Sequence, residues 1–203
     1  MTYKVKTFAD IKDVDWNAVE KAEIKRCLWG NNEYCPRAYG KLAYIKDKGF
    51  YVKLCAYEQN PKAEYLNFYD NVYCDSCLEF FADYSGKREK YVNFEVNSRG
   101  VSLIAFGDND VDNRECITEY FKSIPDVKTK IYKDRWEVYA FFSLENIERV
   151  FPGCKFEKGY EFAGNFYKCG DETEIPHYGS YAEITPEKMR FHRPECFAKF
   201  VIE

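Results

Sequence analysis

The segment VYCDSCLEFFADYSGKREKYVNFEVN (residues 72–97) predicts a β-hairpin and, with it, an all-β fold. Apolar side chains alternate with period two on both arms, which is the pattern of strands that bury one face. The residues on this face are Leu78 and Phe80 on the first arm and Val92, Phe94 and Val96 on the second. We therefore expect the other face of the hairpin to be exposed to solvent.

The exposed face carries two carboxylates that a purely structural sheet would avoid. If the turn is centred near Lys87, Glu79 and Glu95 are direct cross-strand neighbours with Cβ atoms roughly 5 Å apart. Like charges in such positions destabilise a sheet, so a cation, a shared proton or a ligand rich in hydrogen-bond donors should compensate them. Our hypothesis is the ligand, which Asn93 and Asn97 would also contact through amides that both donate and accept.

Composition and charge limit the class of protein. A chain of 203 residues can bury a proper core, and its simplest organisation is a single domain over residues 1–203. Aromatic residues make up 19% of the chain, which supplies both strands and surfaces that stack on flat ligands. The net charge of −4 and the lack of a Lys/Arg run argue against a nucleic-acid partner.

The sequence also gives an expectation about location. The N-terminus lacks the apolar segment of a secretory signal, and no stretch has the apolar length that crosses a bilayer. Nine scattered cysteines resemble free thiols in a reducing compartment more than a disulfide framework. We expect a soluble cytoplasmic chain with no membrane partner, or an extracellular one if a leader was removed.

Further strand patterns extend the hairpin into a sandwich. A short turn ending at Gly49 joins the expected strands 37–45 and 50–58, and later strands are expected at 101–106, 135–143, 162–169 and 196–202. Ser143 is the expected N-cap of a short helix that ends near Val150. Strands at this spacing with few short helical segments predict an antiparallel β-sandwich.

Two groups of cysteines, one of them with histidines, have the residue types of metal or redox sites. Neither group has the spacing or the secondary structure that such sites usually have. Cys74 and Cys77 form a C-x-x-C at the entry to a strand, whereas a thioredoxin-like site needs a strand-to-helix turn. No second C-x-x-C completes a zinc site. A second set has suitable zinc ligand types but no usual spacing: Cys169, His177, His192 and Cys196. We therefore expect neither role.

The acidic loop after Phe106 matches the spacing of a calcium-binding loop in part. The residues at positions one, three, five and twelve are Asp108, Asp110, Asp112 and Glu119. A strand rather than a helix precedes this loop, and Glu115 stands where an apolar anchor is usual. We favour a solvated acidic turn and expect no cofactor, with calcium as the alternative.

The C-terminal third holds a second group of polar and aromatic residues. His177 is followed by Tyr178, and His192 lies between Phe191 and Arg193. Polar and aromatic side chains that converge on one place are typical of small-molecule sites. We therefore interpret these two segments as part of a ligand site.

Four separated motifs resemble those of family 9-like carbohydrate-binding domains, in order, over residues 16–203. They are DSCLEFF (75–81), YVNFEVN (91–97) with Gly100, GNFYKCGD (164–171) with PHY (176–178), and FHRPECF (191–197). The resemblance implies a β-sandwich that binds a mono- or oligosaccharide without catalysis, as an accessory to glycan degradation or uptake. In such modules two tryptophans and nearby charged residues hold the sugar.

The resemblance also assigns roles to single positions. The carboxylate after the Asp-Ser pair corresponds to Glu79, and the position of a ligand-binding arginine corresponds to Glu95. The two tryptophan positions fall near Val72, with Tyr73 adjacent, and at Phe191. We expect the carboxylates to accept sugar hydroxyls and an aromatic ring to stack on the sugar, with Arg193 or His192 offsetting the negative charge. The candidates for stacking are Tyr73, Tyr178, Tyr181 and Phe191.

Two alternatives remain open at the level of the sequence. Carboxylates about 5 Å apart are also used by retaining glycosidases, so Glu79 and Glu95 are candidates for a glycoside hydrolase pair. Neighbours on one hairpin face point the same way, however, whereas such pairs flank the scissile bond. In the other alternative the two carboxylates merely pair with Arg99 and Arg193 in a structural or protein-interaction domain.

Overall fold

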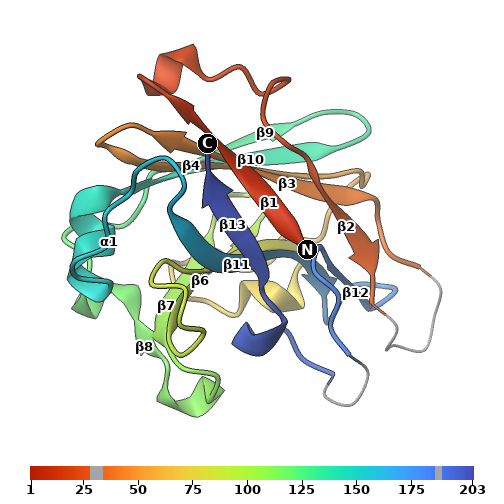
Figure 1. Cartoon of the computed structure of the whole chain (residues 1–203). Coiled ribbons are helices and arrows are strands. Elements are labelled where there is room, and N and C mark those ends of the chain that lie inside the picture. The colour runs from red at the N-terminus through yellow and green to blue at the C-terminus, as the bar shows by residue number, and fades with distance from the viewer. Residues whose placement is uncertain (28–33, 186–188) are drawn as a thin grey trace.

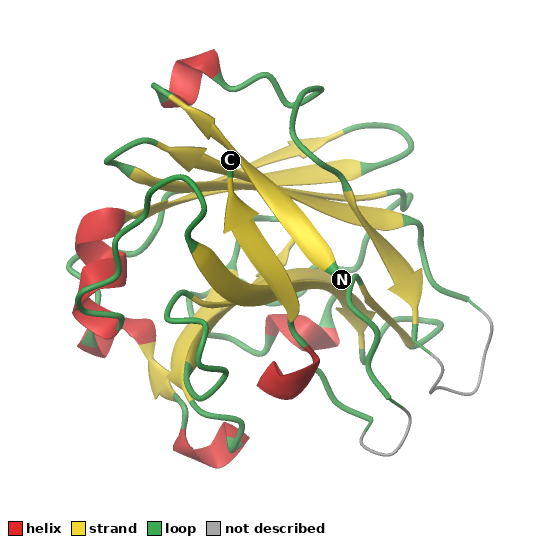
Figure 2. Ribbon diagram, in the orientation of Figure 1, coloured by secondary structure: helices red, strands yellow, loops and turns green. Residues whose placement is uncertain are grey.

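The computed structural model describes residues 1–27, 34–185 and 189–203. Strand is the main regular structure of the described chain, with one α-helix and short 3₁₀ turns at the periphery (Figure 2). The strands stack in two layers, with β3, β4 and β10 above β11 and β6 (Figure 1). The predicted all-β sandwich is therefore confirmed.

The first sheet contains the predicted hairpin. Its order is β8-β7-β6-β5-β11, and β11 then pairs with both β12 and β13. The bounds are β5 (Cys77–Asp83), β6 (Tyr91–Asn97), β7 (Ser102–Gly107), β8 (Glu115–Cys116), β11 (Glu161–Gly170), β12 (His177–Ser180) and β13 (Ala198–Ile202). All of these pairings are antiparallel.

The second sheet has the order β2-β3-β4-β10-β9. Its strands are β2 (Ala22–Arg26), β3 (Ala38–Ile45), β4 (Gly49–Ala56), β9 (Val127–Ile131) and β10 (Trp136–Ser143). Strand β1 (Thr2–Phe8) joins the sheets, because its first half runs parallel to β13 and its second half parallel to β3. Helix α1 (Leu144–Val150) follows β10 with Ser143 as its N-cap, as predicted.

The core lies between the two sheets. The hairpin side chains expected to face inward are all buried there, against inward-facing residues of β4 and β10 such as Leu54 and Val138. Burial of this many apolar side chains is the main force that holds the sheets together. In the described chain, no helix is long and apolar enough to cross a membrane.

The expectation that the other face of the hairpin is exposed is wrong. Glu79 is 2% exposed and Glu95 is 4% exposed. The 3₁₀ helix η2 (Val72–Cys74) and the C-terminal segment cover this face, because Val72, Ile184 and Phe191 pack on its apolar members. The sheet thus has a second, smaller core on its outer side, and the paired carboxylates lie at the edge of it.

Candidate functional site

A cavity of about 640 Å³ opens on the outer face of the first sheet. Strands β5, β6, β7 and β11 form its floor, and four loop or 3₁₀ segments together with strand β12 form its walls. The floor residues are Glu79, Asn93, Glu95, Leu103, Ala105 and Cys169. The wall residues are Tyr69, Asn71, Tyr73, Val111, Asp112, Arg114, Asp171, Tyr178, Met189, Arg190, Phe191 and His192.

Glu79 and Glu95 have the predicted register. They are directly paired between β5 and β6, and both line the cavity. The Oε1 atom of Glu79 accepts a hydrogen bond from the Sγ of Cys169 at 2.9 Å. The Oε1 atom of Glu95 accepts one from the Nδ2 of Asn93 at 2.8 Å. The two carboxyl groups are thus held side by side on the floor and face the same space.

Burial changes the proton affinity of both carboxyl groups. It raises the pKa of Glu95 to about 7, although the bond from Asn93 and the charge of Arg114 oppose the rise. The pKa of Glu79 lies well above its ordinary value because of burial, Cys169 and Glu95. Protonation of these carboxyl groups therefore lowers their like-charge repulsion at neutral pH.

Arg114 is the charged residue that the sequence analysis missed. Its Nε and Nη2 atoms donate to the Oδ1 of Asn93 at 3.1 and 2.6 Å, and Nη2 also donates to the carbonyl of Tyr91. Its guanidinium lies 4.0 Å from the centre of the Tyr91 ring. Because Asn93 in turn binds Glu95, Arg114 fixes the polar floor of the cavity. The one sequence feature that could have pointed to Arg114 is its position in the acidic loop.

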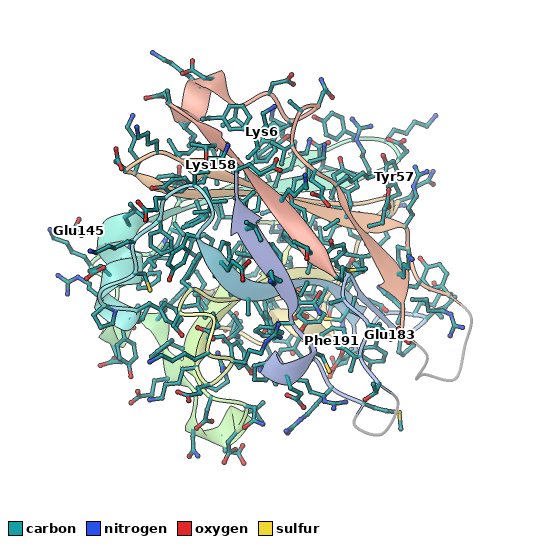
Figure 3. The ribbon with its side chains drawn as sticks, in the orientation of Figure 1. Lys6, Tyr57, Glu145, Lys158, Glu183 and Phe191 are labelled. Carbon is teal, nitrogen blue, oxygen red and sulfur yellow. The ribbon has the colours of Figure 1, made fainter. Side chains whose placement is uncertain are left out.

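Three of the four predicted stacking residues line the cavity: Tyr73, Tyr178 and Phe191. Phe191 lies in the C-terminal segment below the first sheet, far from α1 and Glu145 (Figure 3). Its ring stacks on Tyr167 with centroids 4.3 Å apart and meets Tyr178 edge-on at 6.2 Å. The rings therefore support one another on one side of the cavity.

Four predicted site residues lie outside the cavity lining: Asn97, His177, Tyr181 and Arg193. Asn97 is buried at the end of β6 and donates to the carboxylate of Asp75. Tyr181 packs edge-on against Tyr3 on the inner side of the sheet. Arg193 binds Glu195 and Thr185. The side chains of these residues therefore make contacts within the fold and do not line the cavity.

His177 belongs to a separate buried network. Its Nε2 lies 2.7 Å from the Nζ of Lys168, which also donates to Ser76 and lies 3.4 Å from the carboxylate of Glu58. Lys168 is fully buried. Burial and the charge of Lys168 lower the pKa of His177 to about 4, so this imidazole is neutral at neutral pH.

His192 lines the cavity, but not in the predicted role of a cation. Its Nδ1 lies 2.8 Å from the hydroxyl of Tyr91. Burial and the nearby Arg114 and Arg190 lower the pKa of His192 to about 3. A neutral imidazole cannot offset the carboxylates, and Arg114 provides the positive charge instead.

The acidic loop forms local turns. Asp108 accepts from the backbone N–H of Asp110, which caps the short helix η3 (Val111–Asn113). Asp112 alone of the four calcium candidates lines the cavity, and Glu119 lies in the next 3₁₀ helix, η4 (Ile117–Glu119). Among the residues described, a different set of potential metal ligands converges: Cys77, Glu79 and Cys169.

The predicted arginine partners of the carboxylates bind elsewhere. Arg99 donates to the carbonyl of Ala63 at 2.8 Å, and Arg193 binds as described above. Together with the open cavity, these contacts disfavour the purely structural alternative.

The comparisons with known proteins identify the family. The model of carbohydrate-binding family 9 matches residues 10–202. The chain belongs to carbohydrate-binding family 9. Membership of this family gives the domain a non-catalytic, carbohydrate-binding function. A search of curated proteins found no significant match.

Solved structures support the fold of this family 9 domain. A putative carbohydrate-binding protein from Bacteroides uniformis has a TM-score of 0.81 at 22% identity, covering 100% of this chain and 99% of its own. A family 9 module from Caldicellulosiruptor kristjanssonii in complex with cellotriose has a TM-score of 0.71 at 16% identity, covering 100% and 94%. The same kind of module in complex with glucose gives 0.71 at 17% identity, covering 100% and 96%.

In the described part of the family 9 domain, the geometry of the paired carboxylates does not favour the glycosidase alternative. Glu79 and Glu95 extend from adjacent strands into one side of the cavity. The acids of glycosidases flank the bond that is cleaved. The arrangement is suited to accepting hydrogen bonds from a bound ligand.

Proposed function

We propose that the cavity above β5 and β6 is the saccharide site of this domain and that it takes a monosaccharide or a short oligosaccharide. One observation carries the proposal: Glu79 and Glu95 share a single cavity with the aromatic rings of Tyr73, Tyr178 and Phe191. Its volume of about 640 Å³ lies within the usual range of small-molecule sites.

The polar floor supplies acceptors for sugar hydroxyls. The side-chain amide of Asn93 is held between Arg114 and Glu95, so its orientation and that of the Glu95 carboxyl are fixed before ligand arrives. Within the described chain, every fully buried side-chain nitrogen or oxygen has a hydrogen-bond partner. Since the second oxygen of Glu79 has none there, it opens to the cavity. Hydroxyls would donate to these carboxyl oxygens.

The aromatic residues supply the apolar part of the site. Tyr73 and Phe191 lie at or next to the positions where the family resemblance places sandwiching tryptophans. A pyranose ring presents C–H faces that lie well on an aromatic ring, while its equatorial hydroxyls reach polar groups at the rim. Tyr73 and Tyr178 are half-buried and expose part of their surface to the cavity.

The first ligands to test are those of the solved relatives, glucose and cellotriose. The replacement of a ligand-binding arginine by Glu95 makes this pocket more acidic, so a wider glycan array should precede quantitative work. We propose that the domain serves a glycan-degrading or glycan-uptake system.

Isothermal titration calorimetry of the best glycan tests the proposal. We expect the double variant Glu79→Gln/Glu95→Gln to bind at least about tenfold more weakly at about pH 8, above the pKa of Glu95, because a hydrogen bond to an ionised acceptor contributes about 1.5–3 kcal/mol. Glu157→Gln is the matched control, since Glu157 is exposed and lies outside the cavity lining. Equal affinity of the double variant and wild type would refute the assignment of the site.

A further inference from the structure

Two cysteines and one carboxylate converge at the floor of the cavity. Cys77 and Cys169 are directly paired across β5 and β11, and Glu79 lies two residues along β5 on the same face. One ligand atom from each lies within 4.8 Å of the other two. All three residues are at most 2% exposed. The register of the sheet therefore assembles this cluster without help from a loop.

Among the described residues, no salt bridge reaches the side chains of this cluster. The charge of Lys168 acts on Cys77, but its ammonium donates to Ser76 and to the backbone carbonyl of Cys169 and pairs with Glu58. Glu79 accepts one hydrogen bond there, from the thiol of Cys169, and its second oxygen opens to the cavity. Glu95 faces Glu79 from β6, and Asp171 faces the same space from the end of β11. The guanidinium of Arg114 is engaged by Asn93 and three backbone carbonyls. A cation at the cluster would relieve this concentration of acidic groups.

We propose that Cys77, Glu79 and Cys169 form a binding site for a thiophilic divalent cation of the Zn²⁺ class. Zinc takes thiolate sulfur at about 2.3 Å and carboxylate oxygen at about 2.0–2.2 Å, so atoms this close together can reach one ion. Thiolate ligands select Zn²⁺ or Cd²⁺ over the oxygen-seeking Ca²⁺ and Mg²⁺.

The positions of the three ligands determine which way the remaining coordination position of the ion faces. Three protein ligands leave the fourth position of a tetrahedral ion for water or another ligand. Cys169 and Glu79 both line the cavity, so that position faces it. If the cavity is the saccharide site proposed above, a sugar hydroxyl can fill the fourth position. The metal site itself does not depend on that function.

Metal binding releases protons from the cluster. Each thiol gives up its proton when its sulfur binds the ion, and Glu79 gives up its own where it is protonated. Burial raises the pKa of the Cys77 thiol to about 11 and that of Cys169 as well. These protons must leave before both sulfur atoms can bind the ion.

Titration of the full chain with Cd²⁺ in reducing buffer, without sugar, tests the proposal. We expect an ultraviolet charge-transfer band from thiolate to cadmium that saturates near one equivalent of Cd²⁺ per chain. Added Zn²⁺ should displace the Cd²⁺ and remove the band. Cys169→Ser should abolish the band, and Glu79→Gln should weaken binding about tenfold or more. Cys154→Ser is the control, because Cys154 lies after α1 and bonds to Tyr84 instead.

Two outcomes would overturn the site. One is a wild-type chain that shows no thiolate band at any pH where it is folded. The other is a folded Cys169→Ser or Cys77→Ser variant that keeps the full band. Should either serine variant fail to fold, Glu79→Gln decides, because a folded Glu79→Gln variant that keeps the wild-type affinity for Cd²⁺ overturns the site. Sugar titration of the metal-free chain is a separate measurement, so failure of the metal site leaves the saccharide site intact.

Discussion

Arg114 holds Asn93 through two hydrogen bonds to the same amide oxygen, at 3.1 and 2.6 Å. Asn93 then donates to Glu95, so a residue after the acidic loop sets the geometry of the paired carboxyls on the hairpin. This chain of contacts links the acidic loop to strand β6 at the floor of the proposed saccharide site.

Removal of Arg114 should weaken both the fold and the site. Arg114→Ala leaves the Asn93 oxygen and the Tyr91 carbonyl without this donor, and each such loss costs about 1–3 kcal/mol. We expect lower stability in urea unfolding and at least about tenfold weaker glycan binding. Arg114→Lys keeps the charge but not the paired bonds, so it should restore stability better than affinity. Full affinity in Arg114→Ala would show that the Asn93 orientation is unimportant.

The raised pKa of Glu95 predicts a pH-dependent stability. The folded value of about 7 exceeds the unfolded value of 4.5, so the stabilising contribution is complete below about pH 4.5 and is lost as the pH rises through 7. Glu95→Gln should therefore stabilise the chain at about pH 8, by up to roughly 3 kcal/mol, and change little near pH 5. Chemical denaturation at both pH values measures the difference.

The two histidines also change the stability of the chain with pH, so the wild type must be compared with Glu95→Gln at each pH. His177 and His192 have lowered folded pKa values, so both destabilise the wild type as the pH falls below about 6.5. The difference between wild type and Glu95→Gln removes their contribution, and Glu157→Gln should show no pH-dependent difference. A stabilisation that is the same at both pH values would contradict a buried carboxyl with a raised pKa.

Much of the fold could be predicted from the sequence. Alternation in residues 78–96 fixes which side chains face the core, and the hairpin register follows from its turn. The first strand was missed although Tyr3 and Val5 alternate with polar residues. Its partners β13 and β3 come from distant parts of the chain, and its parallel pairing with both leaves no local signal.

The site was only partly predictable. Alternation says that Glu79 and Glu95 share a face, but it cannot say that loops distant in sequence bury that face. Arg114 and Asp171 enter the cavity from such loops, so no spacing in the sequence connects them to the hairpin. Asn97 shares the face of Glu95 yet lies outside the cavity, because Asp75 and the carbonyl of Tyr65 engage its amide at the end of the strand.

Tyr73 should contribute to binding through its ring. Tyr73→Ala removes an aromatic surface that lines the cavity and is half-buried, so we expect about three- to tenfold weaker glycan binding with a small change in melting temperature. Tyr73→Phe keeps the ring and should bind nearly as well as wild type. If Tyr73→Phe loses as much affinity as Tyr73→Ala, the hydroxyl rather than stacking is responsible.

The buried network around Lys168 should be structural. Lys168→Met leaves the carboxylate of Glu58 buried beside Ser76 and Trp136 without the Lys168 charge, which should cost about 3–5 kcal/mol in urea unfolding. The double variant Lys168→Met/Glu58→Gln removes both charges and should recover part of that loss. Additive losses in the double variant would show that the two charges do not interact.

A crystal structure of the domain with its best-binding glycan tests the central claim most directly. The account predicts a sugar ring in the cavity above β5 and β6, with hydroxyls within hydrogen-bond distance of Glu79 and Glu95 and one face against Tyr73 or Phe191. A sugar bound only elsewhere, such as in the groove lined by Asn60, Arg99 and Tyr132, would contradict it.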